Sequence, residues 1–320
     1  MPVEFDPDFA QAMAPFFAAA AANPQPPTTD PYEIRSRAKP TFEKLMAMLP
    51  ESPDVERQSF TIESYDGQSI TLCRYFKKAA DTTTPGPAIV HAHGGGMIFG
   101  STDLFRKAHA LQTSQSGVQM FSVDYRLAPE HPYPTPAEDC YAALAWVHSH
   151  AADFGIDRQR IATMGESAGG NLAASMTLMA RDRGLSPGVA KQILNYPMLN
   201  DLNLEPIPAL KDRVIWSTEA NIGAWSAYLG ADFRSDRVSQ YAAPARATSV
   251  EGLPPTYLDV GSLDIFLNED LQYVSRIAAA NIPVEVHVYP GLPHASEYFT
   301  PGSAPTNRVL ADRLRAITSL

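Results

Sequence analysis

The sequence is poor in cysteine, in long hydrophobic runs and in basic charge, and each shortage excludes a class of protein. Cys73 and Cys140 are the only cysteines among 320 residues, which argues against a disulfide framework, a metal site or redox chemistry. No run of about 18 or more apolar residues occurs, so no transmembrane helix is expected. The net charge of −10 disfavours nucleic acid and anionic membrane surfaces as partners. A soluble enzyme or a small-molecule-binding protein remains.

The N-terminal segment has the apolar core of a secretory signal but lacks the basic region such a signal needs. Residues 13–22 are apolar, but Glu4, Asp6 and Asp8 precede them. No Lys or Arg occurs before Arg35. We therefore expect a cytoplasmic protein.

Most of the chain alternates between short strand patterns and helical patterns. Runs at 59–64 and 69–75, separated by Asp66-Gly67, predict a hairpin. Further strands are expected at 87–93, 118–125, 160–165, 192–196, 255–260 and 284–289, and helices at 104–115, 136–150, 168–183, 267–280 and 307–317. This alternation predicts an α/β fold, with a mostly parallel central sheet of about eight strands flanked by helices.

Two segments depart from the alternation and predict a helical cap. Residues 1–50 carry helical stretches at 8–22 and 32–48, neither of which can bury its apolar face alone. Residues 200–245 show no strand pattern and are interpreted as a helical insertion. The expected organisation is therefore an N-terminal cap segment at 1–50, a core at 51–199, a cap insertion at 200–245 and the rest of the core at 246–320.

A G-x-S-x-G motif lies where a strand pattern meets a helix pattern, at residues 165–169. This is the sequence context of a nucleophile elbow, in which Ser167 would sit on a sharp turn above the sheet. Gly165 and Gly169 allow the strand and helix to approach closely. The helix N-terminus favours negative charge that develops on the serine.

A second motif, His93-Gly94-Gly95-Gly96, follows the strand at 87–93. A loop of this type can present backbone N–H groups to an oxyanion during acyl transfer. A flexible turn and a phosphate cradle are the alternatives. No Walker A lysine or G-x-G-x-x-G pattern accompanies the loop, which disfavours the phosphate cradle.

A carboxylate and a histidine follow the elbow in the order that a Ser-Asp-His triad of this kind requires. Asp264 and His294 each come just after a predicted strand, at the sheet edge where parallel α/β folds gather their sites. His294 would act as base and then acid, while Asp264 would fix its tautomer.

Other acids and one other histidine compete for these roles. His287 and Asp259 lie inside predicted strands, which favours structural roles for both. Glu269 and Asp270 fall on the next helix, where a charge near the N-terminus has a dipole role. Asp264 and His294 are therefore the preferred pair.

Three motifs together make the chain resemble the hormone-sensitive-lipase-like group of α/β-hydrolase esterases. They are HGGG at 93–96, GESAGG at 165–170 and DYRLAPEHPYPTPAED at 124–139. The resemblance covers roughly residues 85–300. It implies a triad of Ser167, Asp264 and His294 and oxyanion N–H groups from Gly95, Gly96 and Ala168. In the third motif we expect Arg126, Glu130 and Asp139 to be structural. The chain departs from the family at Met97, where an aromatic is frequent, and at Ala295, where glycine is usual.

The resemblance implies a serine carboxylesterase for short-to-medium acyl esters that uses no cofactor and no metal. An amidase, a lactonase or an acyltransferase with the same site is the alternative, and a non-catalytic small-molecule receptor is a further one. We expect Met97, Trp216, Trp225 and Tyr228 to contact substrate, with Phe16 and Phe17 as further candidates. For Trp216, Trp225 and Tyr228, a place in the ordinary core of a helical subdomain is the alternative. A homodimer could form through the last strand, 284–289, or through the cap.

Overall fold

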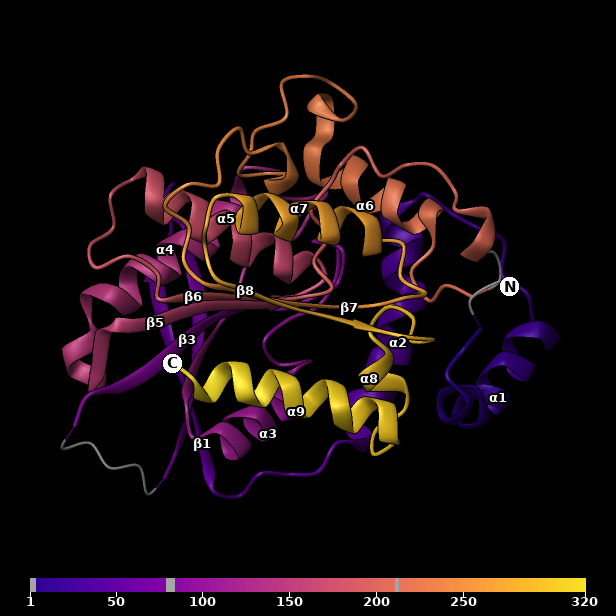
Figure 1. Cartoon of the computed structure of the whole chain (residues 1–320), viewed down its shortest axis with the longest axis horizontal. Coiled ribbons are helices and arrows are strands. Elements are labelled where there is room, and N and C mark those ends of the chain that lie inside the picture. The colour runs from indigo at the N-terminus through magenta and orange to yellow at the C-terminus, as the bar shows by residue number, and fades with distance from the viewer. Residues whose placement is uncertain (1–3, 79–83, 211–212) are drawn as a thin grey trace.

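One eight-stranded sheet, covered by helices on both faces, forms the centre of the computed structural model, which describes residues 4–78, 84–210 and 213–320 (Figure 1). The spatial order is β1-β2-β4-β3-β5-β6-β7-β8. The strands are β1 (Val55–Glu63), β2 (Ser69–Lys77), β3 (Gly86–Ala92), β4 (Gln119–Asp124), β5 (Ile156–Glu166), β6 (Lys191–Asn195), β7 (Thr256–Gly261) and β8 (Val284–Tyr289). This confirms the predicted fold class.

The sheet changes from antiparallel to parallel along its width. β1 pairs with β2, and β2 with β4, in antiparallel register, whereas β4, β3, β5, β6, β7 and β8 run parallel. The hairpin between β1 and β2 turns at Gly67, whose φ of 78° is a conformation that glycine adopts without a steric penalty. The parallel strands end at one edge of the sheet, where the loops that follow them can form a site.

Helices α3 and α9 cover one face of the sheet, and α4, α5 and α7 cover the other (Figure 1). The longer helices of the core are α3 (Arg106–Ser116), α4 (Thr135–Ser149), α5 (Ala168–Asp182), α7 (Leu267–Ala279) and α9 (Ala304–Thr318), and α8 (Ser296–Phe299) is a single turn. All residues of α5 from Ala168 to Ala180 are buried. A helix that is covered on every side gives the elbow at its N-terminus a rigid support.

The two segments expected to form a cap lie at the same end of the molecule. The N-terminal segment contains α1 (Pro7–Ala22) and α2 (Pro31–Met48), and α2 packs against α6 (Thr218–Leu229) of the insertion. Asp6 and Asp30 cap the two N-terminal helices, each directly before a proline at the first helical position. Within its described part the insertion is mostly irregular. Its one α-helix is α6, so the expected helical insertion is only partly helical.

Ion pairs fix the long loop between β4 and α4. Arg126 donates to Asp139 (Nη2–Oδ1 2.7 Å) and to Asp66 (Nη1–Oδ2 2.8 Å). Glu130 receives two hydrogen bonds of 2.7 Å from Arg35 of α2. These contacts agree with the structural roles expected for Arg126, Glu130 and Asp139.

None of the described helices combines the length and the apolar character needed to cross a bilayer.

Candidate active site

Ser167 occupies a sharp turn between β5 and α5. Its φ and ψ are 56° and −120°, a strained backbone conformation for a residue that has a Cβ atom. The turn is possible because its neighbours are glycines. A Cβ at Gly165 would lie 2.1 Å from the carbonyl oxygen of Gly169, and one at Gly169 would lie 2.0 Å from that of Ala92. The elbow therefore depends on both glycines of the motif.

His294 lies between Ser167 and Asp264 and hydrogen-bonds to both. Its Nε2 is 2.9 Å from Oγ of Ser167, and its Nδ1 is 2.6 Å from Oδ2 of Asp264. Asp264 also accepts a hydrogen bond of 3.0 Å from the backbone N–H of Phe266, which fixes the carboxylate. All three side chains are at least nine-tenths buried. The arrangement can carry a proton from the hydroxyl to the imidazole while the carboxylate stabilises the resulting cation.

The competing histidine and the competing strand aspartate have other partners. His287, on the edge strand β8, has its Nε2 2.7 Å from Oε1 of Glu285. Asp259, on β7, accepts two hydrogen bonds from Arg313, of 2.6 Å and 2.8 Å. Both are therefore occupied by structural contacts, as their positions inside strands indicated.

The two competing acids on α7 form no hydrogen bond with His294 among the described residues. Oε1 of Glu269 accepts hydrogen bonds from the backbone N–H groups of Leu199 (2.7 Å) and Asn200 (3.0 Å). Burial raises the pKa of Glu269 to about 8. Asp270 is fully buried, neither carboxyl oxygen has a hydrogen-bond partner among the described residues, and burial raises its pKa well above the usual value. Burial therefore favours the neutral form of Asp270.

The glycine loop after β3 faces Ser167. Gly95 and Gly96 line the same cavity as Ser167, and Ala168 is the first residue of α5. Among the described residues, these three N–H groups donate no hydrogen bond to the surrounding loops or side chains. A Cβ at Gly95 would lie 2.1 Å from the carbonyl oxygen of Phe99, and one at Gly96 would lie 2.8 Å from the Trp216 ring. The loop can thus adopt this path only with glycines at these positions.

His93 supports the glycine loop from behind and takes no part in the proton path described above. Its Nδ1 is 2.8 Å from the carbonyl oxygen of Gly94, and its ring stacks on Tyr125 at 4.2 Å. The Tyr125 hydroxyl donates to the carbonyl oxygen of His93 at 2.8 Å. Burial lowers the pKa of His93 to about 4, so the imidazole is neutral at neutral pH.

Glu166, the residue before Ser167, is held by a buried histidine. Nε2 of His91 lies 2.9 Å and 3.1 Å from the two carboxylate oxygens. Burial acts to raise the pKa of Glu166, but the interactions with His91 outweigh it and the net pKa is lowered. The charged carboxylate therefore fixes the backbone on the sheet side of the elbow.

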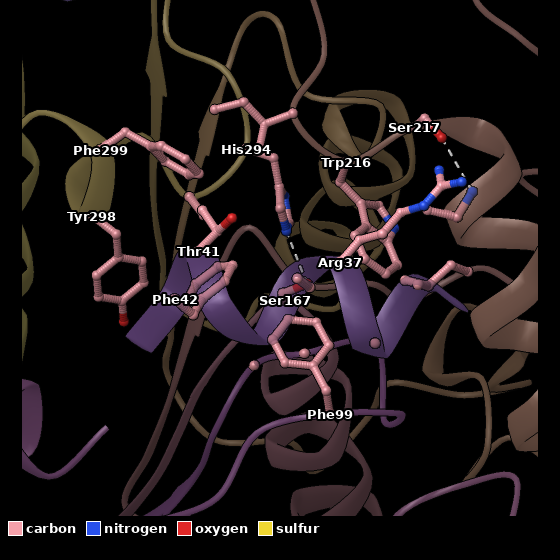
Figure 2. Close-up of a pocket in the computed structure, with 18 of the residues that line it drawn as sticks. Arg37, Thr41, Phe42, Phe99, Ser167, Trp216, Ser217, His294, Tyr298 and Phe299 are labelled. Carbon is pink, nitrogen blue, oxygen red and sulfur yellow. Dashed lines mark hydrogen bonds between the residues drawn. The ribbon is translucent and has the colours of Figure 1, made fainter. Parts of the chain in front are cut away.

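Ser167 and His294 open into a cavity of about 420 Å³ with an aromatic lining (Figure 2). Phe42, Tyr298 and Phe299 lie on one side of the Ser167–His294 pair, and Trp216, Ser217 and Arg37 lie on the other (Figure 2). Phe99 lies below Ser167 in this view. Both cap segments contribute: Phe16, Ile34, Arg37 and Phe42 come from α1 and α2, and Ile215, Trp216 and Ala220 come from the insertion. The cavity can accommodate an apolar ester with the carbonyl at Ser167.

Three of the four expected substrate contacts do not line this cavity. Met97, Trp225 and Tyr228 are completely buried in the core, whereas Trp216 lines the cavity. Met97 directly follows the glycines but has a φ of 57°, and its side chain packs in the core cluster. Trp225 and Tyr228 point from α6 into the protein. The prediction for these three residues is therefore corrected, and Phe17 is likewise absent from the lining.

Most of the aromatic residues that line the cavity were not predicted from the sequence. Phe99, two residues beyond Met97, provides the aromatic ring beside the glycine loop. Tyr298 and Phe299 follow His294 by four and five residues, a proximity in sequence that could have identified them. Phe42 had no such signal, because its position at the site depends on how α2 packs.

No group of three or more His, Cys, Asp or Glu side chains that could hold a metal ion occurs in the described part of the chain.

The core of the chain is similar in sequence to known esterases. Residues 89–297 match a family model described as the alpha/beta hydrolase fold. Esterase LipI of Mycobacterium tuberculosis is 36% identical over 67% of this chain and 66% of its own length. Carboxylesterase NlhH of the same organism is 36% identical over 72% of this chain and 74% of its own length.

Solved structures extend the similarity to nearly the whole chain. A bacterial heroin esterase has a TM-score of 0.86 at 32% identity, covering 98% of this chain and 97% of that one. An esterase of the archaeon Pyrobaculum calidifontis has a TM-score of 0.84 at 28% identity, covering 99% and 98%. The cap segments therefore have counterparts in these structures along with the core.

Proposed function

Because the chain belongs to the α/β-hydrolase-fold family, in its hormone-sensitive-lipase-like group, we propose that Ser167, His294 and Asp264 are the catalytic triad of a serine carboxylesterase. The chain is an ester-hydrolysing enzyme of this type. The observation that supports the residue assignment is the unbroken hydrogen-bonded line from Oγ of Ser167 through His294 to Asp264.

The reaction proceeds in two steps. Ser167 attacks the ester carbonyl while Nε2 of His294 takes its proton, and the N–H groups of Gly95, Gly96 and Ala168 stabilise the oxyanion. His294 returns the proton to the leaving alcohol, and an acyl-enzyme remains on Ser167. Water, deprotonated by His294, then attacks the acyl carbonyl. His294 returns the proton to Oγ of Ser167 as the bond to the acyl group breaks and the acid leaves. The aromatic cavity binds the apolar parts of a short-to-medium acyl ester, and the segments 1–50 and 200–245 act as its cap.

A covalent labelling experiment tests this proposal. An alkyl p-nitrophenyl phosphonate is expected to add once per chain, on the peptide that contains Ser167, and to abolish p-nitrophenyl butyrate hydrolysis in proportion to the adduct formed. Mass spectrometry and the release of p-nitrophenol measure both quantities. Ser167→Ala is the control and should form no adduct. A labelled wild-type protein that keeps its turnover would contradict the assignment. Parallel assays on amides, lactones and acceptor alcohols test the alternative reactions.

The free edge of β8 supports a homodimer as a further part of the proposal. β8 is the last strand in the sheet order, and Val286 and Val288 are exposed by 41% and 40% on one of its faces. An edge strand with exposed valines can pair with a second copy of the chain. Light scattering should give twice the chain mass for the wild type and the single chain mass for Val286→Lys/Val288→Lys. A wild type with the mass of one chain would refute the dimer.

A further inference from the structure

A second cavity adjoins the active-site cavity and shares two lining residues with it. It has a volume of about 250 Å³ and lies between α3, α9 and the segment that follows α2. We call it the rear cavity, and its bordering residues include Ala108, Leu111, Leu310 and Leu314. Glu166 and Tyr298 border both cavities. The two spaces are thus separated at this point by these shared side chains.

Of the two side chains that separate the cavities, only that of Tyr298 can be removed by a substitution without disturbing the turn at Ser167. Glu166 precedes Ser167 and pairs with His91, so it cannot be shortened without disturbing the nucleophile. Tyr298 lies on α8, and its ring packs against Phe42 and Phe105, with ring centroids 6.1 Å away in both cases. Both phenylalanines line the active-site cavity. The ring of Tyr298 therefore completes an aromatic wall.

The walls of the rear cavity suit a hydrocarbon chain. Leucine and alanine side chains from α3 and α9 face it from two sides, and Leu49 and Pro50 add further apolar surface. Oε1 of Glu297 accepts from Arg313 at 2.5 Å, and Glu166 pairs with His91. The polar side chains of His109, Gln112 and Gln115 also belong to the lining. A chain of methylene groups that enters this space leaves water and gains apolar contacts.

We propose that Tyr298 determines how long an apolar arm of the ester the enzyme accepts, because its ring closes the active-site cavity against the rear cavity. With Tyr298 in place, the active-site cavity ends at the aromatic wall and favours short-to-medium arms. Without the ring, the two cavities join and the end of a longer arm passes into the rear cavity. This inference rests on the proposed esterase function and names the residue that limits its substrate class.

The test compares chain-length profiles of wild type and Tyr298→Ala. The acyl arm is varied in p-nitrophenyl esters from butyrate to dodecanoate, and the alcohol arm in alkyl acetates from butyl to dodecyl. Each methylene group that becomes buried should raise kcat/KM about fourfold. In one of the two series, the ratio of kcat/KM for the ten-carbon arm to that for the four-carbon arm should therefore rise at least about tenfold. Unchanged ratios in both series would overturn the proposal.

Two control variants distinguish the loss of the Tyr298 ring between the cavities from a general effect on folding. Tyr298→Phe keeps the ring and should keep the wild-type ratios. Adding Ala108→Phe to Tyr298→Ala refills the rear cavity from α3 and should return the ratio to its wild-type value. If Tyr298→Ala is not folded by circular dichroism, Tyr298→Leu takes its place with the same expected direction. A wild type without activity on any ester would refute the proposed function itself, whereas an active wild type with unresponsive variants refutes only the role of Tyr298.

Discussion

Asp264→Asn is expected to lower kcat by a factor on the order of 10⁴ while the protein remains folded. Oδ2 of Asp264 is 2.6 Å from Nδ1 of His294, so in the wild type Nδ1 carries the proton and Nε2 is free to accept one from Ser167. An asparagine can present its N–H group to Nδ1 instead. The imidazole would then carry its proton on Nε2 and could no longer act as the base.

The two kinetic constants should respond differently to this substitution. Asp264 is buried and does not line the active-site cavity, so substrate contacts are unchanged and KM should stay within about threefold. The rate of phosphonate labelling should fall together with kcat, because both require the activated hydroxyl. Steady-state kinetics on p-nitrophenyl butyrate and stopped-flow labelling measure these effects.

Asp270→Asn provides a matched control six residues along the chain. The Asp270 carboxyl is buried and has no hydrogen-bond partner among the described residues, and burial raises its pKa, which favours the neutral form. An amide of the same shape should therefore leave kcat within about twofold. Equal losses in the two variants, or a loss below tenfold for Asp264→Asn, would contradict the role assigned to Asp264.

The sequence predicts the fold and the triad because both depend on local patterns in chain order. β5 and α5 are joined by a sharp turn at Ser167, and Gly165 and Gly169 allow the strand and the helix to approach closely there. This turn places Ser167 above the sheet. Asp264 and His294 come just after β7 and β8, and parallel strands end at one edge. Sequence order, strand direction and residue type together therefore lead to the three residues that we propose as the triad.

The lining of the active-site cavity could not be predicted in the same way, because residue type does not tell which way a side chain points. Trp225 and Tyr228 lie on a helix that is buried on most sides, so no apolar stripe distinguishes the face toward the core from the face toward the substrate. Met97 is turned into the core by its left-handed backbone conformation, and Phe99 faces the cavity in its place. These orientations are set by tertiary packing.

Arg313→Met is expected to lower the free energy of unfolding by about 3–5 kcal/mol, the typical cost of removing one partner from a buried ion pair. The Arg313 guanidinium forms three buried hydrogen bonds to carboxylates. It donates to Asp259 at 2.6 Å and 2.8 Å and to Glu297 at 2.5 Å. All three side chains are at least nine-tenths buried. Methionine fills part of the space but leaves two carboxylates without a cation.

The same ion pairs connect α9 to the loop that carries His294, the proposed catalytic histidine. Glu297 is three residues beyond His294 and accepts a hydrogen bond of 2.6 Å from the Tyr196 hydroxyl. The ring of Tyr196 packs edge-on against the His294 imidazole, with ring centroids 4.7 Å apart. Because Arg313 holds Glu297 in place, we expect Arg313→Met to lower kcat as well as stability.

Urea unfolding followed by tryptophan fluorescence measures the loss of stability, with Arg308→Met on the same helix as the control. The Arg308 side chain is 59% exposed and lies 3.7 Å from Asp6, so its removal should cost less than about 1 kcal/mol. Adding Asp259→Asn to Arg313→Met removes one of the two uncompensated charges and should recover part of the loss. A cost below 1 kcal/mol for Arg313→Met, or no recovery in the double variant, would show that water or a neighbouring group compensates the carboxylates. The loop that carries His294 would then not depend on α9 for its position.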